Sequence, residues 1–410
     1  MGLNLRWVGD DERERVAEAR MLSFAPGRAA LPAYVERIQN ETHIKAGDFL
    51  LAEKNGEPVG TATSIPMTMW VRGGPVRCQG VAHVGTIKTQ RRKTGAGPGI
   101  ATLVMNEMLR AARERGFVVS ALMPFRGSFY EKFGYGFVER RIEWTLPMAV
   151  LPKGEFDDIG FYRPEDLDEL VRFKQRVTEH THGDIERPRH LWERYIRQAD
   201  EGFVVVDRSA GGAIRSVAFF QDKHDQAGPD SVRVVETIYE DVPALRRQLH
   251  FIGSLRDQYA NAKLMLPADL RLNLLLTETQ MTHRANRNHA TAEARPFNRM
   301  QVRVLDHVKL LGAINLQSTA RGSVVVGVRD VEGGVTKLAI EISEGRVSAK
   351  ATAAAVQVEM ADRVWAPVVF GDLLASEAHR LGLLTTTDER ALGVLDAFGE
   401  GPAPYCHEYF

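Results

Sequence analysis

The chain has 410 residues, more than one ordinary hydrophobic core accommodates, and we expect two or three domains. Its 53 Lys and Arg residues equal its 53 Asp and Glu residues, so no basic excess supports nucleic-acid binding. No apolar run reaches the roughly 18 residues of a membrane-spanning helix, the first residues lack the apolar core of a signal peptide, and two cysteines cannot form a disulfide framework or a cysteine-rich metal site. These features predict a reduced, cytoplasmic protein.

The first 150 residues show an α/β pattern. Asn55-Gly56 is a strong signal for a hairpin between two strands. A glycine-rich turn leads into a helix at 100–115, whose apolar residues form one stripe and which Gly116 ends. The next segment is apolar throughout and suits a buried parallel strand. Together with a helix that begins near Asp11, this order predicts an α/β arrangement with strands at 3–7, 48–53, 59–68, 76–88 and 117–123.

The same order of elements returns after Pro152, without a second glycine-rich turn, which suggests an internal duplication. From Arg299 the pattern changes to short strands and helices, with one helix expected around 356–363. The last segment, 399–410, has too many Gly and Pro residues for a helix and ends in aromatic side chains, which rarely stay in water. We predict an α/β (α+β) protein with two mixed-sheet domains and a final α+β domain, at 1–150, 151–298 and 299–410.

The most specific motif lies between the predicted strand at 76–88 and the helix at 100–115. It reads Arg92-Lys93-Thr94-Gly95-Ala96-Gly97-Pro98-Gly99. Three nearby glycines let the backbone approach a bulky anion, and the free N–H groups and dipole at the start of the helix hold phosphate oxygens. Pro98 suits the first helical turn, where its missing N–H matters little. The motif therefore predicts a phosphate-binding loop.

Two other phosphate-binding loops fit this segment poorly. The nucleotide P-loop needs Lys-Ser or Lys-Thr after its second glycine, and neither follows here. The dinucleotide fingerprint Gly-x-Gly-x-x-Gly belongs after the first strand of a domain, whereas this turn follows several strands and lacks that spacing. A glycine-rich turn that binds no ligand stays open as the alternative.

Arg92-x-x-Gly95-x-Gly97 resembles the Gln/Arg-x-x-Gly-x-Gly/Ala signature of the GNAT acyltransferase superfamily, in which the loop cradles the pyrophosphate of coenzyme A. The resemblance implies that the strand before the loop splays away from the strand after the helix. It also implies that the pantetheine arm of coenzyme A pairs with the backbone of the first of these two strands. The cofactor contacts that it implies come from Gly85, Thr86, Ile87, Arg92, Lys93, Thr94, Gly95, Ala96, Gly97 and Pro98.

Residues 129–137, Phe-Tyr-Glu-Lys-Phe-Gly-Tyr-Gly-Phe, look like the superfamily element Phe-Tyr-x-Lys-x-Gly-Phe. In that element Tyr130 would protonate the leaving thiolate. A phenol with a pKa of about 10 is a reasonable hydrogen-bond donor to a thiolate of pKa about 8.5. The alternative interpretation makes Tyr130 a core aromatic residue beside Phe129 and Phe133.

Nearly the whole chain resembles the Eis-like (enhanced intracellular survival) acetyltransferases, which have a GNAT domain, a degenerate GNAT-like domain and a sterol-carrier-like C-terminal domain. Further markers are Arg91-Arg92-Lys93, the opening of the third domain at Met300, and the aromatic last residue. Thr89 stands where the family usually has proline. Phe125 and Arg126 stand where the family has small or acidic residues near the cofactor, and the resemblance implies that they contact it as well.

The resemblance implies that the α-carboxylate of Phe410 is the catalytic proton acceptor. Its unperturbed pKa of about 3.3–3.7 makes it a weak base, but burial would raise that pKa and its charge would attract a cationic amine. The alternatives are that the tail aromatics only dock the chain end, or that His83, on the strand before the loop, is the base. Glu408 is consistent with an acidic substrate pocket.

These observations predict an N-acetyltransferase that uses acetyl-CoA, needs no metal, and acts on a primary amine of the aminoglycoside, lysine or polyamine type. The alternatives are transfer of a longer acyl chain and a non-catalytic lipid- or acyl-CoA-binding protein. His180-Thr181-His182 lacks further ligands at metal-binding spacing, and we interpret it as a solvated loop. The family often forms hexamers, so we expect a homo-oligomer with no nucleic-acid or membrane partner.

Overall fold

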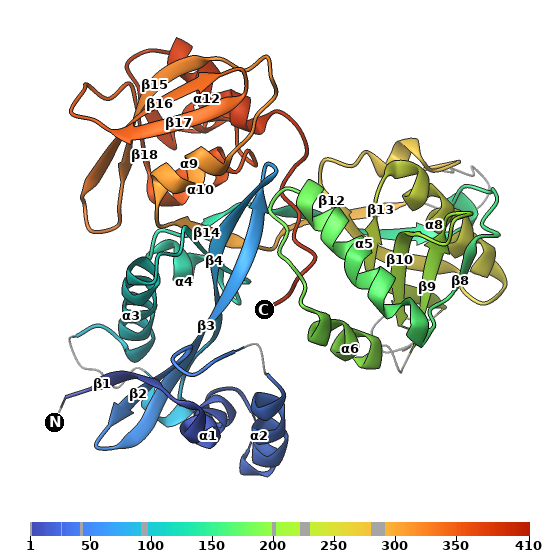
Figure 1. The fold of residues 1–410 in the computed structure, drawn as a ribbon, viewed down its shortest axis with the longest axis horizontal. Helices are drawn as coiled ribbons and strands as arrows, with labels where there is room; N and C mark the ends of the chain where they lie inside the picture. The colour runs from blue at the N-terminus through green and yellow to red at the C-terminus, as the bar shows by residue number, and fades with distance from the viewer. Residues whose placement is uncertain are drawn as a thin grey trace, which may run out of the picture.

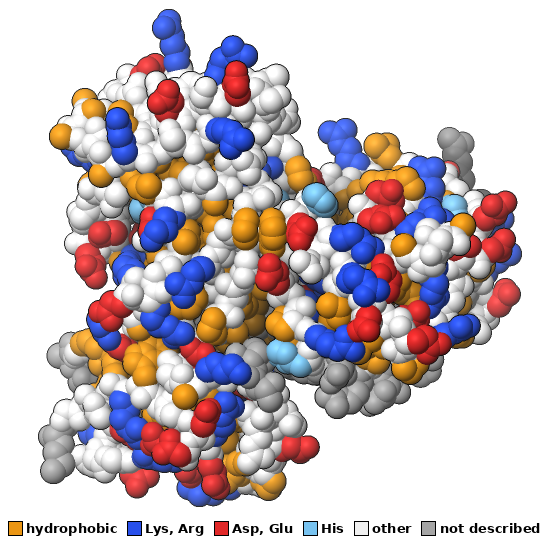
Figure 2. Space-filling view, viewed as in Figure 1, with side chains coloured by type: hydrophobic (Ala, Val, Ile, Leu, Met, Phe, Trp, Pro, Cys, Tyr) orange, Lys and Arg blue, Asp and Glu red, His pale blue; other side chains and the backbone are white. Residues whose placement is uncertain are grey.

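The computed structural model describes residues 2–25, 27–41, 44–91, 97–198, 202–221, 230–279 and 292–410. They form three units, each with its own mixed sheet and its own helices (Figure 1). The predicted α/β class is therefore confirmed. Acidic and basic side chains are interspersed over the face shown in Figure 2, as the balanced composition leads one to expect.

The first unit has a seven-stranded sheet, and helices α1 (Arg13–Phe24), α2 (Leu31–Asn40), α3 (Ile100–Glu114) and α4 (Gly127–Glu131) belong to it. The strands in spatial order are β1 (Asn4–Val8), β2 (Phe49–Lys54), β3 (Glu57–Val71), β4 (Gly74–Thr86), β5 (Val119–Leu122), β14 (Gln301–Val304) and β6 (Gly136–Phe137). The predicted hairpin is present, because Asn55 and Gly56 join β2 to β3 with φ angles of 56° and 81°. Gly116 follows α3 at φ 71°, as a helix-ending glycine does. Helix α2 is an addition to the predicted elements.

The second unit repeats this plan, and its helices are α5 (Leu167–His180), α6 (Arg189–Gln198) and α8 (Val242–Ser254). Its strands in spatial order are β8 (Ile159–Phe161), β9 (Gly202–Arg208), β10 (Ile214–Gln221), β11 (Ser231–Tyr239), β12 (Asn261–Pro267), β7 (Arg140–Pro147) and β13 (Glu293–Asn298). In each sheet the fourth and fifth strands are parallel, and the helix that joins them follows the fourth. This correspondence supports the suggested duplication.

The two sheets exchange one strand each, which differs from the boundaries that the sequence suggested. Strand β7, at the end of the predicted first domain, pairs with β12 and β13 in the second sheet. Strand β14, at the start of the predicted third domain, pairs with β5 and β6 in the first sheet. The exchange ties the two units together through backbone hydrogen bonds.

The third unit is a five-stranded sheet in the order β17 (Arg346–Ala351), β16 (Val335–Ser343), β15 (Gly322–Arg329), β18 (Val358–Ala361) and β19 (Leu384–Thr386). Its helices are α9 (His307–Ala313), α10 (Asp362–Val369), α11 (Ala375–Arg380) and α12 (Arg390–Asp396). The helix predicted around 356–363 is wrong over its first part, since Val358 and Met360 alternate into the core as strand β18. One continuous core joins this unit to β4 and β5 of the first.

After α12 the chain runs between the first and second units, and the C-terminus lies beside β3 and below β12 in Figure 1. A short 3-10 helix ends at Gly399, and no residue from 400 to 410 is helical, as the Gly and Pro content predicts. Among the described residues, no helix combines the length and the apolar character that a membrane crossing requires.

Candidate active site

The candidate site lies where β4 and β5 separate. These parallel strands pair only through Cys78, Gln79 and Gly80, after which β4 continues along β3 alone. The ladder of β3 and β4 contains a bulge, since Thr61 pairs with Gly85 but Thr63 pairs with Ala82. A bulge bends its strand. A cavity of about 700 Å³ opens at this fork.

Tyr130 lines the cavity from α4. Its ring is held by neighbouring aromatic rings: the centroids lie 4.9 Å from Phe129, 5.8 Å from Phe125 and 6.2 Å from Tyr135. Only 5% of the residue is exposed, and this burial raises the pKa of the Tyr130 phenol to about 12. The side chain therefore keeps its proton at neutral pH and has it available for a departing anion.

Phe410 reaches the same cavity from the far end of the chain. A Cβ built on Gly80 would stand 3.1 Å from Cδ2 of Phe410, so the ring lies over the last residue that β4 pairs with β5. The ring also packs against the hydrophobic cluster that contains Ile65 and Ala82. The structure thus brings Tyr130 and Phe410, which lie 280 residues apart in the sequence, to one cavity.

His83 and Phe125 line this cavity as well. His83 sits in the bulge with φ 54°, a left-handed conformation that is uncommon for a residue other than glycine. Phe125 is 76% exposed above Tyr130, while Arg126 turns to Ser128, whose Oγ accepts from Nε at 3.2 Å. The position of His83 keeps it a rival base, and its role stays a prediction.

The predicted phosphate loop is only partly described. Arg92, Lys93, Thr94, Gly95 and Ala96 lie outside the described residues. Gly97 and Pro98 are exposed and lead to Gly99, the N-cap of α3. Gly99 has no side chain to cap the helix, and the first turn of α3 contains no acidic residue. The positive end of this helix is therefore available to an anion.

The three predicted backbone contacts are Gly85 and Thr86 at the end of β4 and Ile87 just after it, and they differ in the hydrogen bonds that their backbone groups already form. Ile87 donates its N–H to Val59 O at 3.0 Å and accepts from Gln90 N–H at 2.8 Å, so both of its backbone groups are engaged within the protein. Thr86 O accepts from Arg91 Nε at 3.3 Å. A Cβ on Gly85 would stand 2.8 Å from Ser23 Cβ, so glycine there is required by the close approach of α1.

Lys132 is a candidate residue that the sequence analysis missed. Its Nζ donates to Thr102 Oγ1, in the first turn of α3, at 3.3 Å, and it lies 4.3 Å from the centroid of Phe129. A cation at the N-terminus of a helix opposes the helix dipole, whereas an anion held between the two would be favoured by both. The motif at 129–137 contained Lys132, but only the fold places it beside α3.

The glycines of the same motif have a structural cause. A Cβ on Gly134 would stand 2.2 Å from Asp362 Oδ2, and one on Gly136 would stand 2.1 Å from Arg363 O. Both contacts come from the N-terminus of α10 in the third unit. The glycines therefore let the third unit pack directly behind Tyr130, and they do not face the cavity of the site.

The second unit has a corresponding fork, since β11 and β12 pair only as far as Val234 and Leu264. Its helix α8 differs from α3 at the N-terminus, where Asp241 Oδ1 accepts from Ala244 N–H at 2.8 Å. A carboxylate already occupies this helix end and would repel a phosphate. The second unit therefore lacks the uncapped helix end that α3 presents, just as its sequence lacks the glycine-rich turn.

One expectation about the polar residues is wrong. His182 is not in a solvated loop: it is buried, its Nδ1 accepts from Arg72 N–H, its Nε2 donates to Phe370 O, and burial lowers its pKa to about 3. Glu408 lines the cavity, and Arg187 Nε pairs with its carboxylate at 2.6 Å. In the described part of the chain, no cluster of three His, Cys, Asp or Glu residues could hold a metal ion.

Comparisons with known proteins agree with this geometry. Family models described as acetyltransferase (GNAT) domains match residues 4–138 and 183–304. An uncharacterized N-acetyltransferase of Streptomyces avermitilis is 26% identical over 92% of this chain and 91% of its own length. A GCN5-related N-acetyltransferase from Anabaena variabilis has the same fold, with a TM-score of 0.83 at 17% identity over the full length of both chains.

The chain is therefore an N-acetyltransferase of the GNAT superfamily, with two GNAT domains. N-acetyltransferase Eis of Mycobacterium tuberculosis is 24% identical to it over 84% of each chain. Within the superfamily, the chain is therefore similar over most of its length to the Eis acetyltransferases. The sterol-carrier-like character of the third unit stays a prediction.

Proposed function

We propose that the protein transfers the acetyl group of acetyl-CoA to a primary amine in the cavity at the fork of β4 and β5. The observation that carries the proposal is that Tyr130 and Phe410 line one cavity of about 700 Å³. A proton donor and a proton acceptor are both needed there, because the amine must lose a proton and the leaving thiolate must gain one.

The residues near α3 fit the phosphates of coenzyme A. The N-terminus of α3 carries neither a side-chain cap nor an acid, and Lys132 adds a positive charge beside its first turn. The loop that precedes α3 supplies Arg92 and Lys93. From Val81 onward β4 has no partner on its β5 side among the described strands, so this edge can pair with an extended arm. When bound, acetyl-CoA supplies the acetyl group as an activated thioester.

The residues of this chain then handle the protons. The α-carboxylate of Phe410 attracts the substrate ammonium, which first loses one proton to solvent. The neutral nitrogen then attacks the thioester carbonyl, and the carboxylate accepts the second proton that this nitrogen loses. Tyr130 donates its phenolic proton to the sulfur that departs, and burial keeps that proton in place at neutral pH. The carboxylic acid and the phenolate exchange their proton through solvent, which restores both groups.

The cavity does not have the strongly acidic wall that a substrate with many positive charges would select. Among the described residues, Glu41 and Glu408 are paired with Arg20 and Arg187. This leaves Glu186 and the Phe410 carboxylate as the acidic groups on the wall, while Arg37 and Arg77 are basic. Glu186 also accepts from Trp70 Nε1 at 3.1 Å. This balance favours amines with one or two positive charges within the predicted class.

A panel assay tests the proposed function. Free thiol release from acetyl-CoA is measured with aminoglycosides, lysine peptides, polyamines and monoamines, and each product is verified by its added acetyl mass. We expect amine-dependent thiol release, and longer acyl-CoA donors measured in parallel report the acyl preference. Thiol release that no amine stimulates, in protein that binds acetyl-CoA, would contradict the proposal.

A further inference from the structure

The inference concerns the segment that delivers Phe410 to the cavity, residues 399–410, here called the tail. Backbone groups along the tail form hydrogen bonds with residues of the first and second units. Arg72 donates to Glu400 O at 2.9 Å, Asp269 accepts from Ala403 N–H at 2.8 Å, and His182 O accepts from Tyr405 N–H at 2.8 Å. The tail is therefore held along its length before it reaches the site.

Cys406 is the next residue of the tail to be held, by one charged residue just before β7 and one within it. Cys406 N–H donates to Glu139 Oε1 at 3.1 Å, and Cys406 O accepts from Arg141. Glu139 and Arg141 are buried and form an ion pair at 2.5 Å. Both backbone groups of Cys406 are thus bound to a buried pair, which fixes the direction in which the chain continues.

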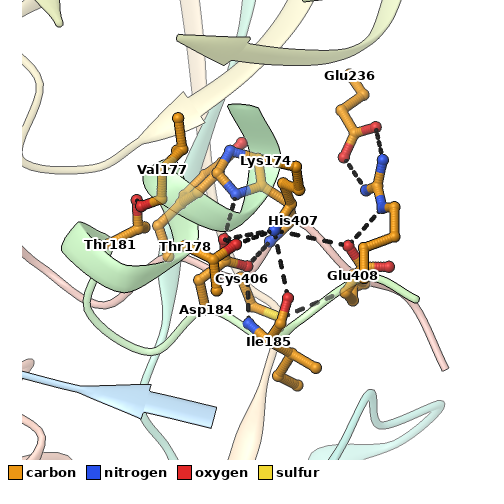
Figure 3. A network of polar contacts seen from close by, with 12 residues as sticks. Lys174, Val177, Thr178, Thr181, Asp184, Ile185, Glu236, Cys406, His407 and Glu408 are labelled. Carbon is orange, nitrogen blue, oxygen red and sulfur yellow. Dashed lines mark hydrogen bonds and ion pairs between the residues drawn. The ribbon is translucent and has the colours of Figure 1, made fainter. Parts of the chain in front are cut away.

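His407 is held by Asp184, which Figure 3 shows at the centre of the network. Asp184 accepts from the backbone N–H and from the ring Nδ1 of His407, each at 2.9 Å. The same carboxylate accepts from Lys174 Nζ at 2.8 Å and from Thr178 Oγ1 at 3.0 Å. All four groups are buried or nearly so, and Lys174 and Thr178 come from α5 of the second unit.

Glu408 is held by Arg187 at 2.6 Å (Figure 3). Arg187 also donates to Glu236 of β11 at 2.6 and 3.1 Å, and its guanidinium lies 4.4 Å from the ring centroid of Trp192 and 4.3 Å from that of Tyr195. Planar bidentate pairing combined with ring packing leaves a guanidinium little freedom. Glu408 is fixed only two residues before the end of the chain.

Docking an apolar tail onto the protein does not require these buried ion pairs and hydrogen bonds. Burying ion pairs removes charges from water, and such pairs are weak evidence for a stabilising role. Geometry offers a reason for them, since a misplacement of about 1 Å at a reacting group can cost about 100-fold in rate. A carboxylate at the end of an otherwise loose strand needs an anchor close to it.

We propose that Arg187 and Asp184 of the second unit are positioning residues for catalysis in the first unit, because through Glu408 and His407 they fix the Phe410 carboxylate at the fork of β4 and β5. The inference rests on the proposed function, in which that carboxylate accepts the amine's proton. The proposal assigns the second unit a direct part in turnover, although the Asp241 carboxylate caps the helix of this unit that corresponds to α3.

The test compares Glu408→Gln with Asp207→Asn. Glu408→Gln removes the charge that Arg187 grips, while Glu236 still pairs with Arg187, so the variant is expected to fold. Asp207 is the matched control: it is buried in β9 of the same unit and pairs with Arg215 at 2.9 Å and Arg247 at 2.7 Å. A protein without Phe410 is the third arm.

We expect Glu408→Gln to lower kcat at least about 10-fold, while the KM for acetyl-CoA stays within two-fold of wild type. For each variant, kcat is calculated per acetyl-CoA binding site, and the number of sites is measured by calorimetry. Asp207→Asn should keep wild-type kcat. The positioning role is overturned if Glu408→Gln keeps wild-type kcat, or if Glu408→Gln and Asp207→Asn lose turnover equally. Either result holds even if removal of Phe410 abolishes turnover. Full turnover without Phe410 would instead overturn both this role and the proposed base.

Discussion

Replacing Tyr130 with Phe separates its proposed chemistry from its packing. The substitution keeps the ring, whose centroid lies 4.9 Å from that of Phe129 and 5.8 Å from that of Phe125, and removes only the hydroxyl group. A positioned general acid contributes about 10²–10⁴-fold to a rate. Since a thiolate is already a fair leaving group, we expect the lower end, a 100-fold loss of kcat, which corresponds to about 2.7 kcal/mol.

Tyr135 provides the matched control. Its ring lies 6.2 Å from that of Tyr130, but its hydroxyl is buried and bonded to Ser120 Oγ at 2.7 Å. Tyr135→Phe should therefore lower the free energy of unfolding by about 1 kcal/mol and leave kcat within two-fold of wild type. Tyr130→Phe should show the opposite pattern, with kcat lowered and the melting temperature nearly unchanged.

The assay is initial-rate thiol release with a saturating amine, combined with thermal unfolding of each variant. If Tyr130→Phe retains near-normal kcat, Tyr130 is a core aromatic residue and not the general acid. If both variants lose turnover in proportion to their stability, the effect is one of packing, and the assignment fails equally.

Three further predictions follow from the site. Gly97→Glu places a carboxylate before the N-terminus of α3 and should abolish acetyl-CoA binding in calorimetry; unchanged affinity in the folded variant would contradict the phosphate-loop assignment. Because burial raises the pKa of Tyr130 to about 12 and the protonated phenol is the active form, kcat should stay level from pH 8 to 10.5, and a fall centred near pH 10 would argue against it. Asp241→Ala removes the cap of α8 and should cost about 1 kcal/mol of stability without changing kcat; lost turnover would show that this helix end takes part in catalysis.

Local sequence signals predicted much of the fold. Hairpin and helix-end glycines acted as expected at Asn55-Gly56 and Gly116, because their φ angles depend on neighbouring residues alone. Helix α2 was missed, since Pro32 near its start reads as a break although it suits a first turn. Strand β18 was taken for a helix because four residues are too few to show a period.

The candidate site was predictable as far as its motifs extend. Tyr130 and the loop before α3 lie in recognisable patterns, and the role of Phe410 was implied by the resemblance to the Eis-like acetyltransferases. The partners of the tail were not predictable, because Asp184 and Arg187 are distant in sequence and look like ordinary charged residues. His182 was misread for the same reason: its two bonding partners come from β-turn and helix-end segments elsewhere in the chain.

The most direct test of the account is turnover in a protein with a few residues added after Phe410. The addition replaces the α-carboxylate with a neutral amide and moves the negative charge, while the loop before α3 and Lys132 are untouched. The same residues added at the N-terminus are the control. We predict that the C-terminal addition lowers kcat by about 100-fold or more with the Kd of acetyl-CoA unchanged, whereas full activity would remove the Phe410 carboxylate from the mechanism and leave His83 as the base to test.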